Sequence, residues 1–354
     1  MSGVLVLARI RSRRPGGRPA GRGPSPERSL ASHDNPAVNM GAVMPRLTCA
    51  LGPDSAGDLL AGIIGGAADA LDLAVYEVGP SYAGPIAAAA SRGVRVRLLV
   101  DAHAGANAAS ARLLAGCGAE VRVWARRPAE AHWKLLVAGD ATLAVGSGNL
   151  IARDAPHPAA GRPGTREWWL AANAAPALAA CARAALEAAW GEADPPPAAW
   201  AGAVAEVPAV GVPRPAVAAL EVDVDPGALE LVTGGRAVTA LLAARLGGVR
   251  HRALVTVPYV HPHVTAVAGL LRALAAAAGR GADARLLLGG VPEPADLAAV
   301  RGLGLGVRVM DPARSTTGHA KGAVLDGAAI AGSANWSGAG LGANLEAALA
   351  ADDV

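Results

Sequence analysis

Two short segments each place a histidine two residues before a lysine: His132 with Lys134, and His319 with Lys321. In a strand, alternate side chains face the same way, so each histidine projects on the same side as its lysine. A lysine ammonium binds a phosphate oxygen, and a neighbouring histidine attacks phosphorus or protonates the leaving oxygen. One such motif supplies a nucleophile or an acid, whereas two supply both. Phosphodiester exchange through a covalent phosphohistidine requires both.

These are the only two lysines among 32 basic residues, and the other 30 are arginines. The chain also lacks phenylalanine and is rich in glycine. This bias indicates that arginine replaces lysine wherever a positive charge suffices. Because a planar guanidinium does not substitute for a compact ammonium at a tight anionic site, the two lysines indicate where such a site lies.

Each HxK motif is followed by an apolar, strand-like run and then by Gly-Ser-x-Asn. The serine hydroxyl, the asparagine amide and nearby backbone N–H groups can complete an anion cradle. Such residues also commonly bond their own turn, but their repeated placement favours the phosphate role. These candidate residues are Ser147, Asn149, Ser333 and Asn335.

The motifs belong to an internal duplication, because His132 and His319 are 187 residues apart and Asn149 and Asn335 are 186 apart. In both halves, short β-rich runs alternate with Ala-rich segments of helical length, which indicates βαβ units. We predict an α/β fold of two similar halves, each a mostly parallel sheet flanked by helices, packed with pseudo-two-fold symmetry around one active site. The predicted segments are a disordered Arg/Pro/Gly-rich tail (1–45), a first half (46–192), a Pro-rich linker (193–227) and a second half (228–354).

The pattern HxKxxxxD followed by GSxN, present twice, resembles the phospholipase D superfamily over residues 46–354. The second copy is complete, with Asp326 as its acid. In the first copy Gly139 stands where the acid belongs and Asp140 follows one place late. The resemblance implies that this acid is structural and that it does not touch the phosphate.

The resemblance also implies an acid after each motif that bonds a histidine ring, and Glu167 and Glu346 occupy the corresponding places. Such an acid fixes the tautomer and stabilises the imidazolium. The family's usual order makes His132 the nucleophile and His319 the acid/base. The altered first motif leaves the reverse assignment open.

The distribution of charge along the chain helps to predict whether the binding partner is a nucleic acid or a lipid. Seven arginines lie in residues 1–45 against Glu27 and Asp34, so the remaining chain has a net charge of about −2 out of the total of +3. A near-neutral body and 3% aromatic residues are weak support for nucleic acid binding. Trp168 and Trp169 either form an apolar wall for a lipid or pack in the core.

We therefore expect a phospholipase D-type phosphodiesterase that hydrolyses or transfers a phospholipid headgroup diester. A nuclease of the same superfamily is the first alternative. The second is a catalytically impaired binding or scaffold protein, motivated by the displaced Asp140 and by the short segment after Glu346.

The sequence indicates no cofactor and no metal, because it contains no HExxH motif and no Cys/His set at ligand spacing. Its three cysteines predict neither a disulfide framework nor a zinc site. No apolar run is long enough to span a membrane. We expect a cytoplasmic protein whose substrate is a phospholipid or another phosphodiester, with peripheral contact to a membrane surface and the oligomeric state left open.

Overall fold

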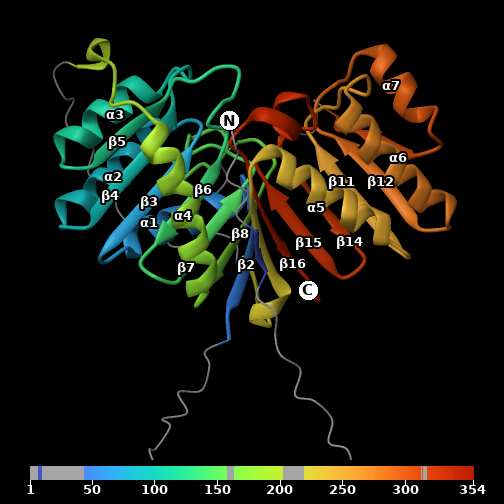
Figure 1. The fold of residues 1–354 in the computed structure, drawn as a ribbon, viewed down its shortest axis with the longest axis horizontal. Helices are drawn as coiled ribbons and strands as arrows, with labels where there is room; N and C mark the ends of the chain where they lie inside the picture. Colours follow the sequence, from blue (N-terminus) through green and yellow to red (C-terminus); the bar gives the residue numbers. More distant parts are fainter. Residues whose placement is uncertain (1–6, 10–43, 158–162, 202–218, 312, 314–316) are drawn as a thin grey trace, which may run out of the picture.

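The computed structural model describes residues 7–9, 44–157, 163–201, 219–311, 313 and 317–354. Figure 1 shows two α/β units side by side, each built on an eight-stranded sheet. The predicted α/β fold with two helix-flanked sheets is confirmed.

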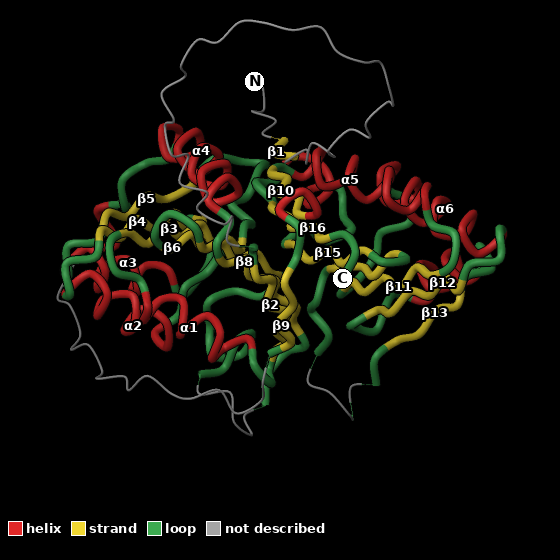
Figure 2. The backbone as a smooth tube through the Cα atoms, turned by 90° about the horizontal axis from the view of Figure 1, so that it is seen from below, coloured by secondary structure: helices red, strands yellow, loops and turns green. Residues whose placement is uncertain are grey.

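The first sheet has the strand order β5-β4-β3-β6-β7-β8-β2-β9. Figure 2 shows helices α1 to α3 on one face of this sheet and α4 on the other. The elements are β2 (Arg46–Gly52), α1 (Ala56–Gly66), β3 (Ala70–Val75), α2 (Pro80–Ser91), β4 (Arg95–Asp101), α3 (Asn107–Gly116), β5 (Glu120–Trp124), β6 (Lys134–Ala138), β7 (Thr142–Gly146), β8 (Glu167–Asn173), α4 (Pro176–Glu192), the 3₁₀ turn η1 (Ala198–Trp200) and β9 (Leu220–Asp223).

The second sheet has the order β1-β10-β16-β15-β14-β11-β12-β13, so β10 to β16 repeat the arrangement of β2 to β8 strand for strand. Helices α5 and α6 lie against it (Figure 2). The elements are β1 (Leu7–Arg9), the 3₁₀ turn η2 (Pro226–Ala228), β10 (Leu229–Thr233), α5 (Gly235–Gly248), β11 (Arg252–Val257), α6 (Thr265–Gly279), β12 (Asp283–Leu288), α7 (Pro294–Arg301), β13 (Gly306–Val309), β14 (Gly322–Leu325), β15 (Ala328–Gly332), the π-helical segment η3 (Ala339–Ala343) and β16 (Ala347–Ala351).

The prediction of mostly parallel sheets was wrong. In the first sheet β4 runs parallel to β3 and β5, and in the second β12 runs parallel to β11 and β13, while the other strand pairs are antiparallel. The reason is the segment that carries each HxK motif. It forms a tight hairpin, β6–β7 or β14–β15, and hairpin strands are necessarily antiparallel because no crossover helix separates them.

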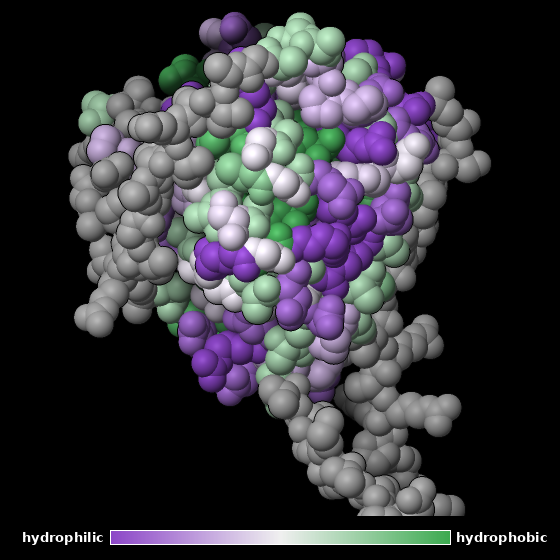
Figure 3. Space-filling model, turned by 90° about the vertical axis from the view of Figure 1, so that its left-hand side faces the viewer, coloured by the Kyte–Doolittle hydropathy of each residue, from purple (hydrophilic) through white to green (hydrophobic). Residues whose placement is uncertain are grey.

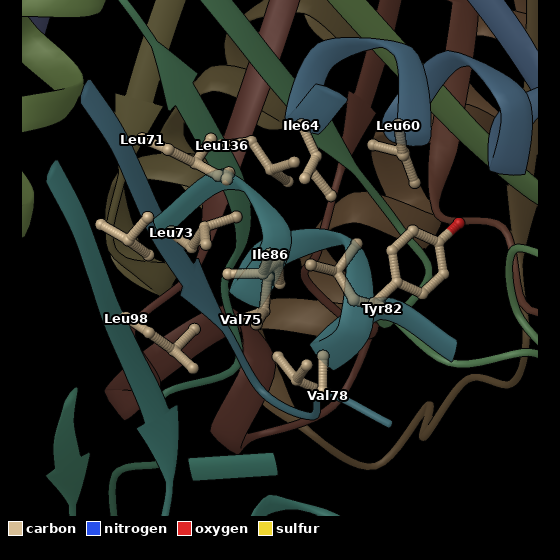
Figure 4. Close-up of a cluster of buried hydrophobic side chains, with 14 of the residues drawn as sticks. Leu60, Ile64, Leu71, Leu73, Val75, Val78, Tyr82, Ile86, Leu98 and Leu136 are labelled. Atoms are coloured by element: carbon tan, nitrogen blue, oxygen red, sulfur yellow. The ribbon is translucent and has the colours of Figure 1, made fainter. Parts of the chain in front are cut away.

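Each half has its own core between a sheet and its helices. In the first half, Leu60 and Ile64 of α1 pack with Leu71 and Leu73 of β3 and with Ile86 of α2 (Figure 4). The strand β3 is apolar at nearly every position because helices or other strands cover both of its faces.

A third cluster of buried side chains joins the halves. It contains Leu143 and Val145 of β7 together with Ala331 of β15 and Leu349 of β16, and it continues under α4. Because one apolar cluster includes strands of both sheets, burial of apolar surface holds the halves together.

Both segments predicted to be irregular contribute a strand. Leu220–Asp223, inside the predicted linker 193–227, forms β9 and pairs antiparallel with β2. Leu7–Arg9, inside the predicted disordered tail 1–45, forms β1 and pairs antiparallel with β10. Each strand extends a sheet edge whose backbone groups would otherwise lack partners. Residues 1–6, 10–43 and 202–218 lie outside the described residues.

The outer end of the first half is shown in Figure 3, where a hydrophobic area is bordered by hydrophilic residues. Within the part of the chain that the structure describes, no helix combines the length and the apolar character needed to cross a membrane.

Candidate active site

Each HxK motif lies at the start of the first strand of a hairpin, near the middle of its sheet. Lys134 opens β6, and Ser147 follows β7. Lys321 directly precedes β14, and Ser333 directly follows β15. Because the two hairpin strands are antiparallel, the start of the first lies beside the end of the second. Each HxK motif therefore meets its own GSxN element.

Backbone contacts between the halves flank the two histidines. Ala131, next to His132, forms a parallel bridge with Leu345, and Arg166 forms one with Gly318, next to His319. These bridges bring both motifs to the boundary between the halves.

Each histidine is bonded to the acid of the opposite half. His132 Nδ1 lies 3.0 and 3.1 Å from the carboxylate oxygens of Glu346. His319 Nδ1 lies 2.7 Å from Oε1 of Glu167. The sequence indicated both acids but not this crossed pairing. A carboxylate on Nδ1 leaves Nε2 of each ring to face the substrate.

The two motif serines hold these carboxylates, a role that differs from the anion cradle we predicted for them. Ser147 Oγ donates a hydrogen bond to Glu167 at 2.5 Å, and Ser333 Oγ donates one to Glu346. Both serines are fully buried. Their hydroxyl protons are engaged, so the serines position the acids that orient the histidines.

The two motif asparagines have unequal surroundings. The backbone N and Nδ2 of Asn149 donate to Asp154 Oδ2 at 2.9 and 3.1 Å. Within the described part of the chain, the buried Oδ1 atoms of Asn149 and Asn335 have no hydrogen-bond partner. Such acceptors are costly to leave unpaired, which favours a bound hydroxyl or water at each one.

Asp154 is fully buried in this site, and our sequence reasoning missed it. It lies in an aperiodic loop after the first motif, and the residue 186 positions later is Gly340, so it is not part of the repeat. One signal was present, because Asp154 is the only acidic residue between Asn149 and Glu167.

Lys134 and Lys321 are buried ammonium groups, and neither has a carboxylate within ion-pair distance among the residues that the structure describes. Lys134 Nζ donates to the His132 carbonyl at 2.9 Å. Lys321 Nζ donates to the His319 carbonyl at 2.6 Å and lies 3.0 Å from both ring nitrogens of His319. Burial lowers the pKa of Lys134 to about 7 and that of Lys321 to about 8. Two such groups form a site that an anion would complete.

Burial also lowers the pKa of His132 and of His319, and the paired glutamates offset this only in part. The charge of Lys321 contributes to the lowered pKa of His132, although the two belong to different motifs. The motifs therefore act on one another electrostatically. Neutral imidazole is the form that attacks phosphorus.

We expect the affinity of this site for an oxyanion to fall as the pH rises. A bound anion raises the pKa of Lys134 and Lys321, so binding takes up protons wherever a free lysine is neutral. Affinity for tungstate should begin to decline near pH 7, where free Lys134 loses its proton, and fall more steeply above about pH 8, approaching tenfold per pH unit for each lysine. Calorimetry in buffers of different ionisation enthalpy measures the uptake, and binding without proton uptake in the declining range would contradict the expectation.

The two motif acids differ in structure. Asp326 accepts hydrogen bonds from the backbone N–H groups of Arg250, His251 and Arg252 at 2.8 to 2.9 Å. These bonds lower the pKa of Asp326 to about 2. Asp140 makes no such bonds among the described residues, because its side chain is fully exposed and meets only Arg183. The predicted structural role therefore fits Asp326 and not Asp140.

Gly139 holds the place of Asp326 in the first hairpin. Gly139 has φ +52° and Asp326 has φ +51°, so both occupy the left-handed region. Glycine adopts this conformation without the steric cost that Asp326 carries, which explains why the first hairpin keeps the same turn without the acid.

Asp326→Ala is expected to lower the melting temperature, because three backbone N–H groups lose a charged acceptor. Asp140→Ala is the matched control and should leave the melting temperature unchanged. The folded-state pKa of Asp326 is depressed, so its contribution is complete above about pH 4 and is lost as the pH falls toward about 2. Thermal melts of both variants from neutral to acidic pH measure this, and equal effects would contradict the assignment.

Asp154, Glu167 and His319 place potential ligand atoms within 4.8 Å of one another. Glu167 and His319 are bonded to each other, and the ammonium of Lys321 lies against the same histidine. A cation there would meet that ammonium at close range. We therefore interpret the cluster as a hydrogen-bonded group.

Aromatic residues support the site from one side. The ring of Tyr76 lies 5.3 Å from that of His132, and Lys134 Nζ lies 5.4 Å from the Tyr76 centroid. Trp169 is fully buried against Gly146, where a Cβ would meet its ring at 2.2 Å. Trp168 packs against Gly322 of the other half. The tryptophans thus have the packing role, whereas Tyr76 lines the site.

Comparisons with known proteins bear on the fold. Residues 242–354 match the family described as "Cardiolipin synthase, PLD-like domain". Among solved structures, phosphatidylserine synthase from Haemophilus influenzae is similar with a TM-score of 0.57 and 14% identity, over 88% of this chain and 85% of that one. Polyphosphate kinase from Porphyromonas gingivalis is similar with a TM-score of 0.53 and 15% identity, over 86% of this chain and 47% of that one.

The phospholipase D family member Nuc from Salmonella typhimurium matches at 21% identity with a TM-score of 0.39, over 43% of this chain and 97% of that one. No curated protein sequence matches. The fold is that of phospholipase D-like proteins, with paired HxK motifs at the boundary of two α/β units. Residues 242–354 match a phospholipase D-like domain, and the chain as a whole shares its fold with phosphatidylserine synthase.

Proposed function

We propose that this protein is a phosphodiesterase that cleaves or exchanges a phospholipid headgroup diester through a phosphohistidine, without a metal ion. One observation carries the proposal. Two buried lysines without an ion-pair partner among the described residues lie beside two histidines, each backed by a buried carboxylate. The positive charge, the nucleophile and the proton donor that one phosphate group requires therefore lie together at the boundary between the two halves.

The chemistry follows from the ring nitrogens that no carboxylate of the described residues contacts, Nε2 of His132 and Nε2 of His319. Nε2 of His132 attacks phosphorus, and His319 donates its proton to the oxygen of the leaving alcohol. Glu346 stabilises the positive charge that develops on His132, and Glu167 does the same for His319. The lysine ammonium groups neutralise the non-bridging oxygens of the transition state.

The second step reverses the proton transfer. Neutral His319 takes a proton from water, whose oxygen attacks phosphorus and releases His132. If another alcohol enters in place of water, the product is a new diester. The crossed Glu–His pairing is important here because each ring carries a positive charge during the reaction, and the paired carboxylate stabilises that charge.

Composition and likeness support a lipid substrate. The body of the chain is nearly neutral and poor in aromatic residues, which disfavours a nucleic acid groove. The matched family is described as a cardiolipin synthase domain, and one structural neighbour is a phosphatidylserine synthase. A neighbour that is a polyphosphate kinase has the same fold, so the fold alone does not select the substrate.

Incubation with phosphatidylcholine vesicles, plasmid DNA and a p-nitrophenyl diester, each in EDTA, tests the proposal. We expect choline release and p-nitrophenol release without nicking of the plasmid. Nicking without choline release would establish the nuclease alternative. No turnover of any of the three would contradict the enzymatic function.

A further inference from the structure

The two histidines have unlike surroundings although their motifs are repeated. His132 has one carboxylate partner, Glu346. His319 has Glu167 at 2.7 Å and, in addition, Asp154, whose carboxylate lies within 4.8 Å of both. His319 thus lies near two buried carboxylates, Glu167 and Asp154, whereas His132 lies near one, Glu346.

The second half has no room for an equivalent of Asp154. At Gly340, a Cβ would lie 2.4 Å from the carbonyl oxygen of Asn335 and 2.9 Å from its nitrogen. In the first half, the corresponding nitrogen of Asn149 is bonded by Asp154. Position 340 in the π-helical segment η3 therefore cannot carry the carboxylate that position 154 carries in the first half.

The side chain of Asp154 is positioned by a neighbouring hydroxyl, and its burial strengthens its electrostatic effect on His319. Thr165 Oγ1 lies 3.2 Å from Asp154 Oδ1 and 3.2 Å from Glu167 Oε1, so its single hydroxyl proton can be donated to either carboxylate. Arg153 reaches Asp154 at 3.3 Å, but its side chain is 72% exposed, so solvent screens its charge. Asp154 itself is fully buried, where a charge acts over longer range.

The other charged groups act on both rings, and Lys321 lies closest to one of them, with its Nζ 3.0 Å from both ring nitrogens of His319. Lys134 and Lys321 both oppose a proton on His132, and Tyr76 adds a neutral ring beside it. Lys321 opposes a proton on His319, whereas Glu167 and Asp154 favour it. Arg166 contacts His319 only through its backbone, because its side chain pairs with Asp54.

We propose that Asp154 is a positioning residue that keeps the proton on His319, so that His319 is the general acid and His132 the nucleophile. This inference rests on the proposed function, and what it adds is Asp154 as a residue that favours the order of roles implied by the resemblance.

The bonds and protons balance under this assignment. The lone pair on Nε2 of neutral His132 forms the N–P bond while the P–O bond to the alcohol breaks. The departing oxygen takes the proton from Nε2 of His319. Water then forms a P–O bond as His319 removes its proton, and the N–P electron pair returns to His132.

Asp154→Asn tests the proposal through the leaving group, because it removes the charge and retains the shape. An alkyl alcohol needs a proton as it departs, whereas p-nitrophenolate does not. We expect turnover of an alkyl diester to fall about tenfold near neutral pH, which corresponds to a loss of about one unit in the pKa of His319. Turnover of the p-nitrophenyl diester should change less than about twofold. Asp140→Asn, the same change on the exposed surface, is the control.

A second test uses the wild-type protein and does not depend on turnover. Titration of the ring signals by NMR, assigned with His132→Gln and His319→Gln, should show a higher pKa for His319 than for His132. In Asp154→Asn, the His319 pKa should drop and that of His132 should change much less.

Equal losses on both diesters, or a pKa of His132 at or above that of His319, would overturn the role of Asp154. A wild-type protein that turns over no diester would instead contradict the proposed function, and the titration would still test the bias. Should Asp154→Asn fail to fold, the wild-type titration alone decides.

Discussion

His132→Ala and His319→Ala are each expected to reduce phosphodiester turnover by about 10³-fold or more, because removing either member of a catalytic unit disables the whole. The two rings lie at one boundary and are each bonded to the acid of the opposite half. Steady-state rates with an alkyl diester measure both variants.

The two variants should differ in what they accumulate. With a p-nitrophenyl diester labelled in its retained group, His319→Ala still forms the phosphoenzyme, since that leaving group needs no acid. It cannot activate water, so label should persist on His132. His132→Ala should retain no label.

The control for this pair is His251→Ala. His251 is exposed and lies directly before β11, away from the strand ends that carry the motifs. This variant should retain wild-type turnover. Near-full activity in either catalytic variant would refute a shared site, and label on His319 would reverse the assignment of roles.

Lys134→Met is expected to lower turnover strongly and to stabilise the protein. Lys134 is fully buried, and burial lowers its pKa to about 7, so the folded protein holds its charged form at a free-energy cost. Methionine has similar length without the charge, and replacing buried ionic groups by apolar ones is often stabilising by about 1–4 kcal/mol. Loss of the phosphate contact should lower turnover by about 10²–10³-fold.

The pH dependence of the stabilisation has a definite sign. The unfolded lysine binds its proton up to its ordinary pKa, whereas the folded one releases it near pH 7. The unfolded state therefore binds more protons above that pH, and wild-type stability rises with pH. The advantage of Lys134→Met should be largest below about pH 7 and shrink above it.

Thermal or denaturant unfolding at several pH values measures this effect. Lys134→Arg is the companion variant, since it keeps the charge but enlarges the head group, and it should lose activity without gaining stability. A lower melting temperature for Lys134→Met than for the wild type at pH 6 would contradict the interpretation of Lys134 as an anion-binding group held at a cost to stability.

Local pattern was sufficient for much of the fold. Apolar runs such as β3 and the Ala-rich stretches predicted helices and strands in the right order, because their periodicities are set by neighbouring residues. Strand direction was not predictable in this way. It depends on which strands pair, and the short turn at Gly139 makes the HxK segments antiparallel hairpins.

The edge strands were also not predictable from local sequence pattern. Leu220–Asp223 has weak strand character in a Pro-rich context, and it becomes β9 because the edge of β2 is open to pairing. A strand of this kind depends on a partner distant in sequence. Composition alone therefore assigned it to a linker.

The sequence by itself predicted the two HxK motifs, the acids Glu167 and Glu346 and the resemblance to the phospholipase D superfamily, because these depend on repeated local spacing. Only the tertiary structure decided which acid serves which histidine, since those pairs join residues 152 and 214 positions apart. It also decided that the serines hold the acids, that Asp140 is a surface residue and that Asp154 lies in the site. Such contacts arise when two halves pack against each other, and no spacing within either half encodes them.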